Sequence, residues 1–219
     1  MNLRYLSDAH ERWVRSWWIA LQDKDSTSAL RSPELTGLGR GDRARLRRAA
    51  SIEELEIERA AQLLTFGLLG ESWRSFNMQQ WMATDAKPLL VVAGVLAAVK
   101  QDAHDGHSLV WHMGQSTVGG GTPPMSELRF RRLLKVRRLE EFFTAARRAV
   151  ALANSARGGA DVVILADDLV AWAFERHMRE AERPAQTMSF RWAQDYYRPQ
   201  KGKDVDLTVN SKIEEGERA

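Results

Sequence analysis

The 219-residue sequence contains no cysteine, and this absence removes several classes of function. Without thiols the chain can form no disulfide, no thiolate metal site and no cysteine nucleophile. A long apolar run is also missing, because the longest, residues 89–99, is far shorter than the roughly 20 residues that cross a bilayer. The N-terminus lacks the charged-then-apolar pattern of a signal peptide. We therefore expect a cytoplasmic protein with no membrane partner.

Alternating strand patterns and internal repeats are missing too. Helical periodicity is present instead, and it predicts an all-α protein of two small, bundle-like helical lobes. We place the N-terminal lobe at residues 1–100 and the C-terminal lobe, which carries the basic helices, at residues 125–198. A Gly- and Pro-rich surface loop, residues 101–124, joins them. The polar residues 199–219 are expected to be disordered.

Within the N-terminal lobe, the capping-box pattern of Ser51 and Glu54 predicts the start of one long helix that ends at Gly70. Its buried stripe is expected to include Phe66. Residues 87–100, with Pro88 in the first turn, form the most apolar helix. We expect this helix to be central to the N-terminal half.

Positive charge is concentrated, although the formal net charge is only +3 and the pI is near 9.4. Arginine greatly outnumbers lysine, and its planar guanidinium group suits phosphate and stacks on bases. The strongest bias lies in residues 125–153, whose basic residues are Arg129, Arg131, Arg132, Lys135, Arg137, Arg138, Arg147 and Arg148. A helix capped by Ser126 would turn Phe130 and Leu133 inward and Arg131 and Lys135 outward. Such a ridge suits a polyphosphate partner, whereas a solvated surface face is the plainer alternative.

The apolar stripe of this segment changes phase near Arg137, which predicts a break between two helices there. A second basic segment, residues 39–50, carries five arginines against the single acid Asp42. Leu46 is its only large apolar residue, so we expect a short and mostly exposed helix. Arginines this close repel one another unless an anion or an acidic partner lies nearby.

Residues that could support catalysis do not form a recognisable set. The three histidines of residues 101–124 lie in the predicted loop without further ligands, so we expect no metal site. The glycine run 119–121 lacks the Lys-Ser/Thr of a P-loop, so no nucleotide cofactor is expected. Asp167 and Asp168 are adjacent and point about 100° apart, unlike a catalytic carboxylate pair, and we expect both to be exposed. The sequence therefore predicts a protein that is not an enzyme and needs no cofactor.

Three segments together resemble one known family. They are GRGDRARLRRAAS at residues 39–51, SELRFRRLLKVRRLEEFFTAARRAV at residues 126–150, and LADDLVAWAF with RWAQDYY between residues 165 and 197. They are similar to the CasB family, the small subunit of the type I-E CRISPR Cascade surveillance complex. The middle segment is the most specific. The resemblance covers both lobes but neither residues 23–38 nor the tail after Pro199.

The resemblance implies an all-helical, two-lobed, non-catalytic protein that serves antiviral defence. It implies two copies in the complex, contacts with the large subunit CasA and the backbone subunit CasC, and binding to crRNA, target DNA and the displaced strand of the R-loop. The positions that match the family's basic surface are Arg48, Arg129, Lys135, Arg138 and Arg147. The residue pattern adds Arg40, Arg43, Arg47, Arg131 and Arg132 as further nucleic-acid-binding candidates.

The leading hypothesis is a nucleic-acid-binding subunit without sequence preference, because contacts to phosphate carry no sequence information. A second hypothesis is a protein-interaction module whose basic helices meet acidic partner surfaces. A third is a helix-turn-helix-like regulator, which would need a recognition helix that reaches base edges.

Overall fold

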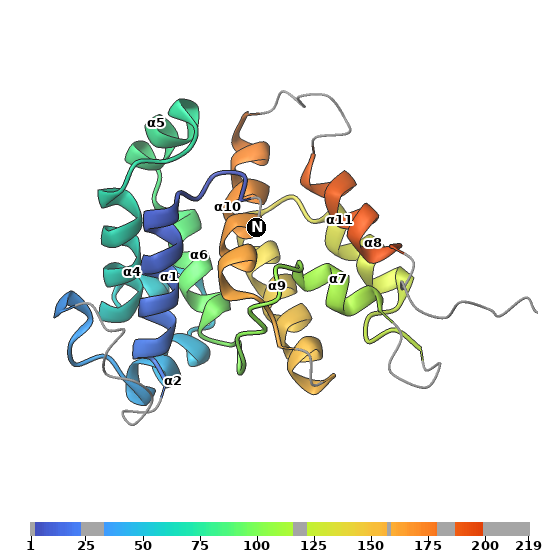
Figure 1. The fold of residues 1–219 in the computed structure, drawn as a ribbon, viewed down its shortest axis with the longest axis horizontal. Helices are drawn as coiled ribbons and strands as arrows, with labels where there is room; N and C mark the ends of the chain where they lie inside the picture. Colours follow the sequence, from blue (N-terminus) through green and yellow to red (C-terminus); the bar gives the residue numbers. More distant parts are fainter. Residues whose placement is uncertain (1–2, 23–32, 116–121, 157–158, 179–186, 199–219) are drawn as a thin grey trace, which may run out of the picture.

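The computed structural model describes residues 3–22, 33–115, 122–156, 159–178 and 187–198 (Figure 1). Within these residues the protein is all-α, as predicted, and its only β-type pairing is an isolated bridge between Asp102 and Ala160. The predicted disordered tail and the glycine run 119–121 lie outside the described residues. The α-helices are α1 (Asp8–Ala20), α2 (Arg40–Arg48), α3 (Ile52–Glu56), α4 (Arg59–Gly70), α5 (Phe76–Thr84), α6 (Lys87–Leu96), α7 (Leu109–Gly114), α8 (Glu127–Lys135), α9 (Leu139–Ser155), α10 (Val162–Met178) and α11 (Met188–Tyr196), and a short 3-10 helix covers Pro33–Leu35.

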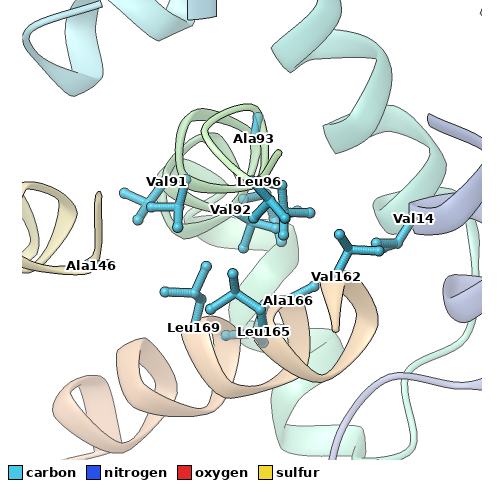
Figure 2. Close-up of a cluster of buried hydrophobic side chains, with 14 of the residues drawn as sticks. Val14, Val91, Val92, Ala93, Leu96, Ala146, Val162, Leu165, Ala166 and Leu169 are labelled. Atoms are coloured by element: carbon cyan, nitrogen blue, oxygen red, sulfur yellow. The ribbon is translucent and has the colours of Figure 1, made fainter. Parts of the chain in front are cut away.

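The apolar helix α6 lies at the centre of the fold, as its sequence predicts. From Pro88 to Leu96 every residue is buried, and Pro88 sits in the first turn, where no backbone donor is needed. Figure 2 shows Val92 and Leu96 of α6 above Leu165 of α10. Helices α2, α3, α4, α9 and α10 all pack against α6. The burial of one apolar helix by partners from both predicted lobes therefore organises the whole core.

The segment between residues 101 and 124, predicted to be a loop, contains helix α7. Ser108 caps this helix by accepting a hydrogen bond from the Trp111 backbone N–H at 3.2 Å. A Cβ added at Gly114 would lie 2.2 Å from the Tyr196 carbonyl oxygen, so α7 and α11 pack backbone to backbone. The buried apolar residues on both sides of this segment form one continuous cluster. The division into two lobes stays a prediction, and six helical residues are too few to show a periodic pattern.

The single helix predicted for residues 51–70 is two helices, α3 and α4. Ser51 Oγ accepts from the Glu54 N–H at 3.3 Å, as the capping box predicts, but the Glu54 carboxylate accepts from Ala50 at 2.8 Å. The break after α3 changes which side of the following helix faces the core. Phe66, predicted to be buried, is 67% exposed, so this expectation was wrong.

Asp167 and Asp168 were expected to be exposed, and this expectation was also wrong, since they are 2% and 3% exposed. The Asp167 carboxylate accepts three backbone N–H groups from residues 4–6, at 2.7 to 2.9 Å. Asp168 Oδ2 accepts a hydrogen bond from Trp192 Nε1 of α11 at 3.0 Å. Helix α10 is covered on more than one side, so its polar positions are buried as acceptors for neighbouring elements.

Candidate nucleic-acid interface

A groove of about 810 Å³ lies between α2, α9 and the segment that follows α6. Its basic residues are Arg47, Arg48, Lys100, Arg147 and Arg148, and its other lining residues are Ala44, Ala50, Ala98, Thr144, Ala151, Asn154 and Ser155. None of these lining residues is acidic. The fold thus gathers five cations from three separate stretches of chain into one concave surface.

Helical spacing produces the α9 wall of the groove. Thr144, the adjacent pair Arg147 and Arg148, Ala151 and Ser155 recur at intervals of three or four residues and therefore lie on one side of the helix. The opposite face of α9 is buried in the core. The alanines of the lining keep the groove open because they carry no long side chain.

The groove floor is the carboxyl end of α6, where helix carbonyls lack partners within the helix. Arg43 of α2 donates to two carbonyls at and just beyond this end, with Nε donating to the O atom of the C-cap residue Ala97 at 3.0 Å and Nη2 donating to Val99 O at 2.6 Å. Its Nη1 donates to Gln22 Oε1 at 2.6 Å. Burial lowers the pKa of Arg43, and the nearby charge of Arg47 lowers it further. The structure therefore turns this predicted contact residue inward.

Asn154 of α9 also hydrogen-bonds the backbone that follows α6. Its Nδ2 donates to Ala98 O at 2.9 Å, and its Oδ1 accepts from the Lys100 backbone N–H at 3.0 Å. The backbone of residues 98–100 is thereby held between α2 and α9. Lys100 itself is exposed and projects from this fixed backbone.

Arg147 joins α9 to the carboxyl end of α2. Its Nη1 donates to Ala49 O at 2.6 Å, and its Nη2 donates to the Arg47 carbonyl. The guanidinium group lies 5.1 Å from the centre of the Phe143 ring. Burial lowers the pKa of Arg147, and the Arg47 charge adds to this effect. A cation here also complements the negative end of the α2 dipole.

Four groove cations remain unpaired within the described part of the chain: Arg47, Arg48, Lys100 and Arg148. All four are exposed. On the same helix as two of them, Arg45 is in contrast held by Asp42 at 2.5 Å and by Glu58 at 3.1 Å. The groove is therefore a surface of uncompensated positive charge on a rigid base.

The remaining site candidates lie elsewhere. Arg40 is exposed at the start of α2. Arg129, Arg131, Arg132 and Lys135 are exposed on α8, and Arg138 is exposed immediately before α9. Figure 1 shows α8 at the end of the molecule away from α2. The structure thus separates the predicted basic surface into a groove and a distant ridge.

The break predicted near Arg137 is confirmed, because α8 ends at Lys135 and α9 begins at Leu139. Ser126 occupies the cap position of α8, but its side chain makes no cap hydrogen bond, contrary to prediction. Arg131 donates to Glu127 Oε1 at 2.5 Å, one turn away. Arg138 Nε lies 3.9 Å from Glu140 Oε2. The ridge therefore carries some acidic compensation, unlike the groove.

Two groove residues were missed as site candidates. Arg148 is part of the basic segment, but its neighbour Arg147 was chosen in its place. Lys100 follows an apolar helix and carries no local signal, because only the packing of α2 and α9 places it among other cations.

A family described as CRISPR-associated protein Cse2 matches residues 42–197, which is more than half of the chain. The chain belongs to the Cse2 family. Cse2 is the small subunit of type I-E Cascade, CasB, so the resemblance seen in the sequence is confirmed and the chain is a CRISPR Cascade subunit. Neither the curated proteins nor the solved structures contain a match. The family match includes Arg47, Lys100 and the α9 wall of the groove.

Among the described residues, no helix is long and apolar enough to cross a membrane. In the same part of the chain, no group of three or more His, Asp or Glu residues is placed to hold a metal ion.

Proposed function

We propose that this Cascade subunit binds the sugar-phosphate backbone of nucleic acid in the groove between α2 and α9, without sequence preference. The observation that carries the proposal is the convergence of five cations, with no acid among the lining residues. Phosphate contacts release condensed counterions, which favours binding to any sequence.

In the assembled complex this binding would help hold crRNA and target DNA and steady the displaced strand, in antiviral defence. Formation of an R-loop is nearly balanced in free energy, so a few backbone contacts are enough to shift it. The partners that the family resemblance implies, CasA, CasC and a second copy of the chain, are part of this proposal. Arg129, Lys135 and Arg138 on and after α8 stay predictions that the groove does not require.

A non-catalytic role belongs to the same proposal. The groove lining consists of Arg, Lys, Ala, Thr, Asn and Ser, which supply charge and hydrogen bonds, and none of these lining residues is a His, Asp or Glu that could act as a general base. Asp167 and Asp168 serve as internal hydrogen-bond acceptors away from this surface. In this proposal the groove acts through its charge and its hydrogen bonds.

The test is fluorescence anisotropy of labelled single-stranded and double-stranded DNA of unrelated sequences, titrated with the purified chain across a salt series. Four unpaired cations predict that log K falls with log salt with a slope of about −2.8 for single strands and about −3.6 for duplexes. The double variant Arg48→Glu/Arg148→Glu should weaken binding at least tenfold and flatten the single-strand slope by about 1.4. Arg12→Glu, which reverses the charge of one exposed arginine of α1, is the control and should leave both quantities unchanged.

An unchanged affinity and slope in the double variant would show that the groove is not the binding site. A strong preference for one DNA sequence would contradict backbone recognition. Loss of binding in Arg12→Glu as well would mean that overall charge, rather than the groove, governs the interaction.

A further inference from the structure

An exposed leucine lies in the middle of the basic face of α8. Leu128 is 60% exposed. At 100° per residue, Arg131, Arg132 and Lys135 all lie within about 60° of it around the helix. A phosphate-binding ridge gains nothing from an aliphatic side chain at its centre, so this position needs another explanation.

An exposed aromatic side chain at the carboxyl end of α11 lies beside α8. Tyr197 donates its hydroxyl to Glu127 Oε1 at 2.9 Å and is 54% exposed. Next to Tyr197, the rings of Phe130 and Tyr196 stack with their centres 4.1 Å apart and join the two helices. We call Leu128, Tyr197, Arg131, Arg132 and Lys135 the α8–α11 patch.

The patch differs from the groove in chemistry. It has an acid at its edge, Glu127, whose pKa is lowered by hydrogen bonds from Tyr197 and Arg131. It has large apolar side chains, whereas the groove lining has none larger than alanine among its apolar residues. Tyr and Arg around an apolar centre are typical of the core of protein–protein interfaces.

We propose that the α8–α11 patch is a docking surface for a protein partner in the assembly, whose own surface presents an apolar side chain surrounded by Asp or Glu. Apolar contact with Leu128 would supply binding free energy, and Arg131, Arg132 and Lys135 would select the acidic surround. Three residues predicted to bind nucleic acid are thereby assigned to a protein contact. The proposal does not depend on the function of the groove.

The variant Leu128→Lys separates a protein contact from a phosphate contact, because it removes the apolar centre while it adds a cation. Labelled chain is titrated against the Cascade assembly purified with its crRNA but without this subunit, and incorporation is measured. Leu128→Lys should incorporate at least tenfold more weakly than the unmodified chain. Phe66→Lys, an equally exposed apolar residue on α4, is the matched control and should incorporate within twofold of it.

DNA binding by the isolated chain is measured in parallel. We expect Leu128→Lys to bind DNA as the unmodified chain does, while Arg48→Glu/Arg148→Glu loses DNA binding and keeps the patch intact. Normal incorporation of Leu128→Lys would overturn the proposal. Tighter DNA binding by Leu128→Lys would also overturn it, because that result would mark a phosphate site. The proposal would fail as well if the chain self-associates and Leu128→Lys abolishes the self-association, because a second copy would then be the occupant. Lys135→Glu should weaken incorporation without an apolar change, and normal incorporation of this variant would also overturn the proposal.

Discussion

Replacement of Asp168 by Asn should stabilise the protein near neutral pH. Asp168 is enclosed between α10 and α11, and its one hydrogen bond in the described part of the chain comes from Trp192. Burial raises the pKa of Asp168 to about 7, and the charges of Asp167 and Asp195 add to the rise, against the hydrogen bond and Arg191. The carboxyl group must therefore keep a proton in the folded state that it loses readily when unfolded. Asn supplies the same acceptor to Trp192 without a titrating charge.

The sign of the pH dependence of stability follows from the direction of the Asp168 pKa shift. The folded pKa lies above the unfolded value of 3.8, so the folded state binds more protons between the two values and stability falls as pH rises through that window. The full difference corresponds to about 4 kcal/mol. The gain in free energy of unfolding from Asp168→Asn should be near zero at pH 3.5 and should grow to at most about 4 kcal/mol at pH 8.

Urea denaturation followed by tryptophan fluorescence, at several pH values from 3.5 to 8, measures this difference. Asp167→Asn is the control, because that carboxylate accepts three backbone N–H groups and its replacement should destabilise the fold throughout. A pH-independent difference between Asp168→Asn and the unmodified chain would refute the reasoning. A variant less stable than the unmodified chain at pH 8 would refute it as well.

Two further predictions concern packing. Arg43→Met should lower the free energy of unfolding by about 2–4 kcal/mol in urea denaturation, because the carbonyls at the end of α6 lose their donors, whereas the exposed Arg12→Met should change it little. Gly114→Ala should destabilise by about 1–3 kcal/mol, because its Cβ would meet the α11 backbone at 2.2 Å. Gly70→Ala, with no atom within 4 Å of the added Cβ, is the matched control, and equal thermal shifts for the two variants would contradict the packing of α7 on α11.

Strong periodicity made the helices of the core predictable. α6 could be placed at the centre because nine successive residues are apolar or small, a pattern that only full burial explains. The break after Lys135 was visible because the apolar stripe changes phase there. The break between α3 and α4 was not visible. α7 was not visible either, since it is short and packs on the distant helix α11. The burial of Asp167 was hidden for the same reason: its partners are residues 4–6, far away in sequence.

The roles of the basic residues could not be predicted from the sequence for the same reason, and these roles bear on function. The sequence shows how many arginines the chain has, but not which of them make hydrogen bonds within the fold. Arg43 and Arg147 occupy the ends of two helices, where their hydrogen bonds set the floor and wall of the groove. Arg47, Arg48 and Arg148 are chemically identical to them but point into the open space that those bonds create. The half-buried Arg43 and Arg147 therefore set the shape of the groove, and the exposed arginines supply its free charge. Substitution of either group should weaken nucleic-acid binding, but only substitution of the exposed group should change the salt dependence of binding.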